Sequence, residues 1–151
     1  DLGPLVVLFA GGGTNGAPTS YSAYTISKIA LIKMTELLDA ELPDTRFVII
    51  GPGWVNTKIH NETLFAGNRS GDAYERTLEI IENDEFTEMS RVLDCLDWLN
   101  SMPRTVIGGR NFSVAHDQWG RVALEEALKD DSSLYKLRRN GNNDLVPEKK
   151  K

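Results

Sequence analysis

Residues 5–13 read LVVLFAGGG, an apolar run of strand length followed by three glycines. A continuous apolar run of this kind predicts a strand buried on both faces of a parallel sheet. Residues 46–50 read RFVII and end at a Gly-Pro-Gly turn, so they predict a second buried strand. Helix-favouring residues lie between the two strands, from about residue 22 to residue 42. This strand–helix–strand crossover indicates an α/β fold.

The rest of the chain continues the alternation of strands and helices. We expect an irregular loop over residues 54–70 and helices near residues 71–83 and 86–101. Residues 105–114 favour a third strand, interrupted by two glycines, and a last helix follows to about residue 128. Alternating elements of this kind predict a three-layer, Rossmann-like parallel sheet.

Length and composition indicate one globular domain. The 151 residues are 40% hydrophobic and 26% charged, as in soluble globular proteins. We therefore expect a single domain over residues 1–128 and a polar, frayed and solvated tail over residues 129–151. The net charge of −5 argues against nucleic acid as a partner, because duplex binding usually needs a clustered basic face.

The chain shows no segment that would carry it into or across a membrane. No stretch approaches the roughly 18 to 20 apolar residues that span a bilayer, and no signal-peptide pattern is present. The sequence therefore predicts a cytoplasmic protein without a membrane partner. The chain also opens at Asp1 without a methionine and runs straight into an apolar segment, as if it had been cut just ahead of a buried strand.

Metal-ligating residues are scarce. A single cysteine, Cys95, cannot form an internal disulfide, and the only histidines are His60 and His116. Their spacing matches no zinc site, so we expect no bound metal. The acidic residues between Asp72 and Glu88 are typical of a solvated helical face.

A glycine pattern resembling a phosphate-binding turn follows the first strand. Gly11, Gly13 and Gly16 satisfy G-x-G-x-x-G. In a dinucleotide-binding turn, however, a helix begins at the third glycine so that its N-terminus faces the pyrophosphate. Here residues 17–19 read APT and keep the chain in a loop. We therefore interpret the glycines as a turn in which the chain leaves the edge of the sheet.

The start of the first helix carries a candidate acid–base pair. Tyr24 and Lys28 are four residues apart, so their side chains share one face of the helix and can act on one substrate atom. A turn with the pattern Pro-Gly-x-x-x-Thr follows the next strand, from Pro52 to Thr57. Together, Tyr-x-x-x-Lys and this turn resemble the short-chain dehydrogenase/reductase family. The resemblance covers residues 4–116, which correspond to the C-terminal half of such an enzyme.

The resemblance implies a function and a set of roles. In that family the tyrosine is the general acid or base on the carbonyl or alcohol oxygen, and the lysine lowers its pKa and holds the nicotinamide ribose. Carried over, these roles fall on Tyr24 and Lys28. The residues implied to contact the nicotinamide end of NAD or NADP are Lys28, Pro52, Gly53, Val55 and Thr57. The implied reaction is hydride transfer between NAD or NADP and an alcohol or a ketone.

Two departures from the family keep a second interpretation open. The family usually places a serine about 13 residues before the tyrosine, where this chain has Ala10 and Gly11. Thr14 is a candidate replacement, although its offset differs. The N-terminal half of the family fold, with its glycine-rich cofactor turn, is not among these residues. The alternative is a catalytically silent binding or scaffold protein that keeps the family core and its dimer surface.

The first helix carries more apolar surface than one sheet can cover. Its apolar residues spread over about 200° of the helical wheel, which implies a partner helix. They are Ile26, Ile29, Ala30, Leu31, Met34, Leu37 and Leu38. In the resembled family this helix packs against its copy, so the resemblance implies a homodimer or a homotetramer.

The other aromatic and apolar residues, and His60, are interpreted first in structural terms. A cluster in the helix expected near residues 86–101 is predicted to be core, comprising Leu93, Cys95, Leu96, Trp98 and Leu99. Trp54 and His60 are candidates either for shaping the substrate pocket or for simple loop packing. Trp119 is a candidate either for covering the site or for anchoring the last helix, and we favour the anchor.

Overall fold

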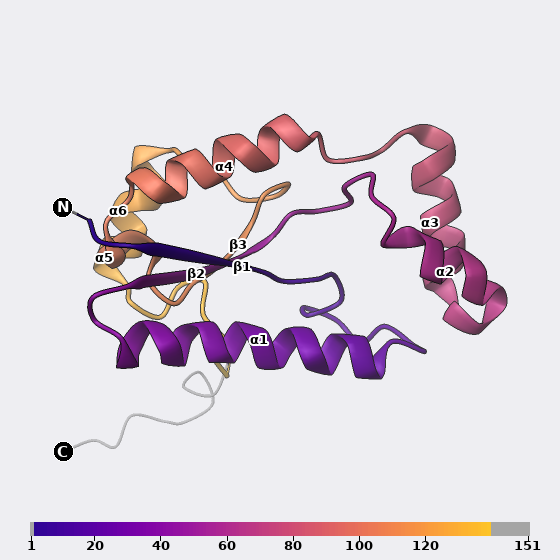
Figure 1. The fold of residues 1–151 in the computed structure, drawn as a ribbon, viewed down its shortest axis with the longest axis horizontal. Helices are drawn as coiled ribbons and strands as arrows, with labels where there is room; N and C mark the ends of the chain where they lie inside the picture. The colour runs from indigo at the N-terminus through magenta and orange to yellow at the C-terminus, as the bar shows by residue number, and fades with distance from the viewer. Residues whose placement is uncertain (1, 140–151) are drawn as a thin grey trace, which may run out of the picture.

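The computed structural model of this chain describes residues 2–139 and shows a mixed α/β fold (Figure 1). Its three strands are parallel and run in the order β1-β2-β3. In chain order the elements are β1 (Leu5–Phe9), α1 (Ser22–Glu41), β2 (Arg46–Gly51), α2 (His60–Ala66), η1 (Gly67–Ser70), α3 (Asp72–Asn83), α4 (Met89–Ser101), α5 (Arg104–Ile107), β3 (Asn111–Ser113) and α6 (Val122–Asp130). The predicted crossover of β1, α1 and β2 is confirmed to within one residue at each boundary.

Both hydrophobic clusters of the core contain residues of the central strand β2. Its side chains alternate between the two faces of the sheet, as strand geometry requires. Ile49 packs with Ile32 of α1, whereas Val48 and Ile50 pack with the apolar face of α4. Figure 1 accordingly shows α1 below the sheet and α4 above it. In the predicted α4 core cluster, Leu93 is the exception, since its side chain is 54% exposed.

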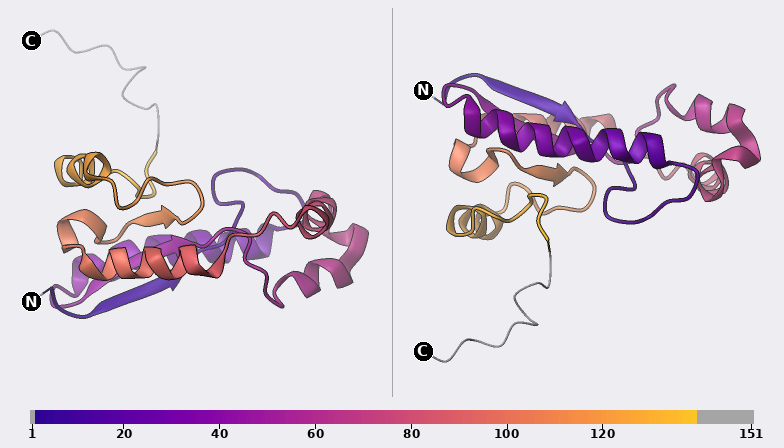
Figure 2. Two further views of the ribbon diagram at one scale, coloured as in Figure 1. Left: turned by 90° about the horizontal axis from the view of Figure 1, so that it is seen from above. Right: turned by 90° about the horizontal axis from the view of Figure 1, so that it is seen from below.

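The first strand lies at an edge of the sheet, and this corrects the prediction that it is buried on both faces. Figure 2 shows β1 at one edge and α6 beyond β3 at the other. Val6 and Phe9 remain 38% and 46% exposed. An apolar run shows that a strand is hydrophobic, but its place in the sheet depends on which strands pair with it.

The predicted third strand is mostly not a strand. Within residues 105–114, the first part belongs to the one-turn helix α5, and only Asn111–Ser113 forms β3. Val106 and Ile107 are fully buried, so their β-branched side chains give the same apolar signal as a buried strand. Gly109 has a φ of +66°, which turns the chain between α5 and β3.

The segment predicted as an irregular loop contains two short helices. Residues 54–70 include α2 and η1, which pack against α3 at the end of the molecule to which β1 points (Figure 1). Ser70 donates to the carbonyl oxygen of Thr63 at 3.0 Å and ties η1 to α2. Helices of this length have little periodicity to detect and depend on packing for stability.

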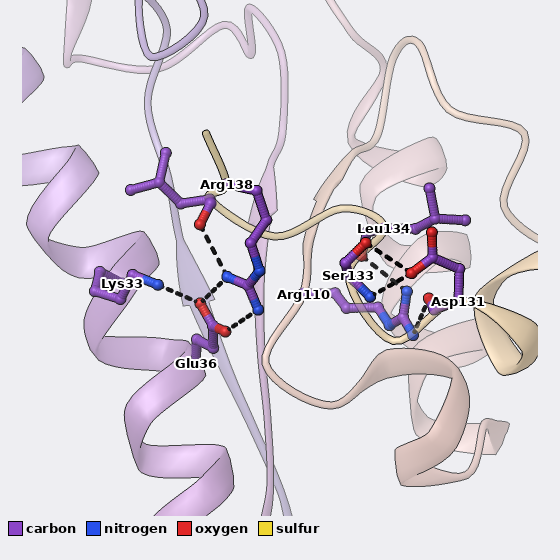
Figure 3. Close-up of polar contacts among 8 residues, drawn as sticks. Lys33, Glu36, Arg110, Asp131, Ser133, Leu134 and Arg138 are labelled. Carbon is purple, nitrogen blue, oxygen red and sulfur yellow. Dashed lines mark hydrogen bonds and ion pairs between the residues drawn. The ribbon is translucent and has the colours of Figure 1, made fainter. Parts of the chain in front are cut away.

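The C-terminal segment is held more firmly than a solvated tail up to Arg138. Helix α6 ends at Asp130, slightly beyond the predicted residue 128. The buried guanidinium group of Arg110 then donates to the carbonyl oxygen of Leu128. It also donates to the carbonyl oxygens of Asp131 and Leu134 (Figure 3). Three carbonyls on one buried cation fix the path of this segment. The rest of the predicted tail, from residue 140 onward, lies outside the described residues.

Candidate functional site

The candidate site lies at the carboxyl ends of β1 and β2, which meet at one edge because the strands are parallel. The N–H of Ala10 donates to the carbonyl oxygen of Ile50 at 2.8 Å, so the two strands are still paired where the loops begin. The hydroxyl groups of Tyr21 and Thr63 are 2.8 Å apart and join the start of α1 to α2. Ligands of open α/β sheets bind outside this end of the strands.

The side chains of Tyr24 and Lys28 contact each other on the first two turns of α1. The ammonium group of Lys28 donates to the carbonyl oxygen of Phe9 at 3.2 Å and lies 5.6 Å from the centroid of the Tyr24 ring. The i, i+4 spacing therefore brings the pair together at the end of β1. The ammonium group faces the ring and the strand end.

The electrostatic state of Tyr24 differs from what the resemblance implies. Burial, followed by the neighbouring Tyr21, raises the pKa of Tyr24 above its usual value. Desolvation disfavours the phenolate, since a charged oxygen loses hydration in a half-buried position. The described arrangement therefore raises the pKa of Tyr24, whereas the resemblance implies that Lys28 lowers it.

Gly11 lies directly under the hydroxyl group of Tyr24. A Cβ on Gly11 would overlap the Tyr24 hydroxyl oxygen and lie 2.7 Å from its Cζ atom and 2.9 Å from its Cε1 atom. This position is 13 residues before Tyr24, where the resembled family has its serine. Thr14, the candidate replacement, lies in the following turn over residues 12–15.

The turn from Pro52 to Thr57 is fixed by contacts that the sequence pattern did not reveal. Gly53 has a φ of +82°, and a Cβ there would overlap the hydroxyl oxygen of Thr87. The N–H of Thr87 donates to the carbonyl oxygen of Trp54 at 2.7 Å. Thr87 therefore closes over the turn from a position far along the chain, and no local motif marks it.

Aromatic side chains cover the same turn. The rings of Trp54 and His60 stack with centroids 5.0 Å apart, and Phe86 lies 6.1 Å from His60. His60 also donates from Nε2 to the carbonyl oxygen of Val55 at 2.9 Å. Trp119 lies elsewhere, donating to the carbonyl oxygen of Val114 and packing on the α4 core, which favours the anchoring role.

A cavity of about 290 Å³ lies beside the turn. Its lining residues are Val55, Asn56, Asp84, Phe86, Thr87, Glu88 and Met89. This volume is at the small end of the range for ligand pockets and suits one ring-sized group. Of the residues implied to contact the nicotinamide end, only Val55 lines this cavity.

The glycines after β1 do not form a phosphate cradle. Helix α1 begins only at Ser22, with no side-chain cap, well after Gly16. The N-terminus of a helix must follow the third glycine directly to face a pyrophosphate. Within residues 2–139, no helix begins at these glycines. Their interpretation as a turn is therefore confirmed.

Other chemistries find little support within the part of the chain that the structure describes. No group of His, Cys, Asp or Glu side chains there could hold a metal ion. Burial raises the pKa of Cys95 to about 11, so its thiol is a poor nucleophile. No described helix combines the length and the apolar character needed to cross a bilayer.

Comparison with known proteins found no matching family model, no matching curated protein and no matching solved structure.

Proposed function

We propose that residues 4–116 form the C-terminal half of a short-chain dehydrogenase/reductase, with a three-layer, Rossmann-like parallel sheet. The open edge of β1 supports this proposal. Arg46 donates to the carbonyl of Pro4, and Ala10 donates to that of Ile50. Because hydrogen bonding alternates along a strand, the N–H groups of Leu5, Val7 and Phe9 face outward, without a partner among the described residues. Such an edge is suited to pairing with a further strand.

The complete enzyme transfers a hydride between NAD or NADP and an alcohol or a ketone. The observation that carries this proposal is the contact of Tyr24 with Lys28 at the carboxyl end of β1. The neighbouring strand end bears the turn from Pro52 to Thr57, beside a ring-sized cavity.

Each residue of the pair has a defined task in the proposed reaction. Tyr24 exchanges a proton with the substrate oxygen, and Lys28 stabilises the phenolate and binds the ribose. Residues Pro52, Gly53, Val55 and Thr57 orient the nicotinamide end. The cofactor supplies the hydride when it is bound, and the protein supplies position and proton transfer.

The energetics require a closed site. The reference pKa of tyrosine is about 10, so this pKa must fall by about three units for the residue to work near neutrality. That shift corresponds to roughly 4 kcal/mol. A lysine about 4 Å from the phenol oxygen supplies on the order of 4 kcal/mol at an effective dielectric of 20, but only about 1 kcal/mol in bulk water. The proposed role of Lys28 therefore requires that water is excluded from the site of the complete enzyme.

A second candidate function is a catalytically silent binding or scaffold protein with the same core. Two observations favour it. Gly11 stands where the family has a serine, and the raised pKa of Tyr24 opposes proton transfer near neutrality. The enzyme is the first candidate because both members of the acid–base pair are present and in contact.

We also propose a homodimer or a homotetramer in the cytoplasm. The outer face of α1 supports self-association, since Ile26, Met34 and Leu37 are 66%, 42% and 51% exposed. Apolar side chains in a row on one helix are typical of an interface. The buried free thiol of Cys95 is compatible with a reducing compartment.

The test is a panel of alcohols and ketones with NAD and NADP. It is performed on a protein that contains this chain together with the cofactor-binding half of the fold. The absorbance of the reduced nicotinamide reports turnover. Turnover that depends on Tyr24 supports the enzyme, and inactivity across a broad panel supports the silent scaffold.

A further inference from the structure

We propose that Gly11 is a positioning residue of the candidate site: because residue 11 has no side chain, the Tyr24 hydroxyl group rests against the end of β1. The role of Gly11 in catalysis rests on the proposed function, whereas its effect on Tyr24 does not. The resting contact is available to Tyr24 only if residue 11 is glycine.

Steric exclusion is the first step of the argument. A Cβ on Gly11 would overlap the Tyr24 hydroxyl oxygen and approach Cζ and Cε1 to 2.7 and 2.9 Å. These separations are shorter than any ordinary contact between nonbonded carbon atoms. Two atoms of the ring as well as its hydroxyl group are involved, so rotation of the hydroxyl alone cannot relieve the clash.

The partner that yields is Tyr24. The chain at Gly11 continues directly from a strand end held by the hydrogen bond from Ala10 to Ile50. Gly11 itself lacks a positive φ, so its backbone accepts a side chain without strain. A half-buried tyrosine ring swings more easily than a paired strand shifts. A side chain at residue 11 would therefore move the ring outward and leave the fold in place.

Both members of the pair are seated on the same stretch of backbone. Lys28 donates to the carbonyl oxygen of Phe9, and Tyr24 lies on Gly11. The end of β1 thus sets where the hydroxyl and ammonium groups stand relative to each other. Gly12, the next residue, has open space where its Cβ would be.

A tyrosinate titration tests this inference without any need for activity. The absorbance change of each protein is measured against the same protein carrying Tyr24→Phe, so that only Tyr24 contributes. Burial raises the pKa of Tyr24, so Gly11→Ala should lower that pKa toward the usual value as the ring moves into water. Gly12→Ala is the matched control and should leave the titration unchanged. A Tyr24 pKa in Gly11→Ala that equals or exceeds the control value overturns the inference.

Turnover provides a second test, in which two explanations of Gly11 predict opposite changes. If Gly11 merely marks a lost serine, Gly11→Ser should raise turnover. If Gly11 positions Tyr24, Gly11→Ser should lower turnover by on the order of 10- to 100-fold, since small displacements of reacting groups have effects of this size. Turnover equal to or above that of the unsubstituted protein contradicts the inference. A protein inactive on every substrate counts against the proposed function, and the titration alone then decides the role of Gly11.

A Gly11→Ala variant that fails to fold still tests the inference. If Gly11→Ala prevents folding, the same substitution is made in the Tyr24→Ala background, where the clash no longer exists. Restored folding supports the inference, because it shows that Tyr24 caused the conflict. Continued failure shows that the backbone, and not Tyr24, requires glycine, and it overturns the inference.

Discussion

The ammonium group of Lys28 lies over the aromatic ring of Tyr24, 5.6 Å from the ring centroid, while it donates to the carbonyl oxygen of Phe9. The pair is thus assembled, but its charge faces the ring. A cation over a ring contributes about 0.5 to 1 kcal/mol at an exposed site. Under the proposed function, Lys28 supports the phenolate strongly only where water is excluded from the site.

Removal of the proton-transfer group should abolish most of the turnover. Tyr24→Phe should lower turnover of the complete enzyme by at least about 10² to 10⁴, the usual contribution of general acid–base catalysis. Cofactor affinity should change little, because the phenol oxygen acts on the substrate. Steady-state kinetics and cofactor titration measure the two effects. Activity that survives Tyr24→Phe would sink the mechanism.

Lys28 should be coupled to Tyr24. Lys28→Ala should lower turnover to a similar degree and also weaken cofactor binding, and the Tyr24→Phe, Lys28→Ala double variant should lose little more. Lys28→Arg should rescue poorly, since a planar guanidinium group does not replace a compact ammonium group. Lys33→Ala is the control, because Lys33 lies on the same helix but pairs with Glu36. Fully additive losses in the double variant contradict a shared device.

The isolated chain should bind a nicotinamide dinucleotide poorly. Helix α1 begins too late to face a pyrophosphate, and the proposed contacts of this chain with the cofactor are limited to its nicotinamide end. Stabilisation by a ligand grows as RT ln(1 + [L]/Kd), or about 2.7 kcal/mol at a hundredfold excess over Kd. Thermal melts with millimolar NAD or NADP should therefore show no measurable shift. A clear shift would overturn the proposal that this chain is half of the fold.

The outer face of α1 should mediate self-association. Met34→Glu places a charge on the exposed apolar stripe, so it should convert a dimer into a monomer in light scattering. Ile81→Glu is the matched control, because Ile81 is 43% exposed on α3, compared with 42% for Met34. A compact monomer of the unsubstituted chain at high concentration would count against this prediction.

Arg110 should contribute strongly to stability. Its guanidinium group is buried and donates to the carbonyls of Leu128, Asp131 and Leu134. Arg110→Met removes these charge-assisted bonds and leaves carbonyls unpaired, so the free energy of unfolding should fall by about 3 kcal/mol. Urea denaturation measures the loss. Arg121→Met, at an exposed residue before α6, should change stability by less than about 0.5 kcal/mol.

Acid should weaken the ion pair between Arg138 and Glu36, which joins the C-terminal segment to α1. Glu36 accepts hydrogen bonds from Arg138 and Lys33 (Figure 3), and these contacts, Arg138 foremost, lower the pKa of Glu36 to about 2. A lowered folded-state pKa adds stability above the unfolded value of 4.5, and this contribution is lost as the pH falls from about 4.5 to about 2. Glu36→Gln should flatten that part of the pH profile in urea denaturation. An unchanged dependence of stability on pH would contradict a stabilising role for the contact between Glu36 and Arg138.

Local patterns were sufficient for the elements that build the site. The apolar runs at residues 5–10 and 46–50 and the Pro-Gly turn located β1, α1 and β2, because strand and helix formation depends on short-range periodicity and turn residues. The i, i+4 spacing of Tyr24 and Lys28 was enough to bring them onto one helical face. Those features depend only on neighbours in the chain.

Long-range contacts were beyond the reach of the sequence. The place of β1 at the sheet edge, the one-turn helix around Val106 and the hydroxyl group of Thr87 over Gly53 all depend on which distant segments pack together. The same is true of Gly11, whose pattern indicated only a turn. Its contact with the Tyr24 ring arises because α1 returns across the end of β1, and an absent side chain leaves no mark in periodicity. Sequence alone located β1, α1 and β2 and placed Tyr24 and Lys28 on one helical face, whereas tertiary packing decided the remaining elements and where each hydroxyl and charge comes to rest.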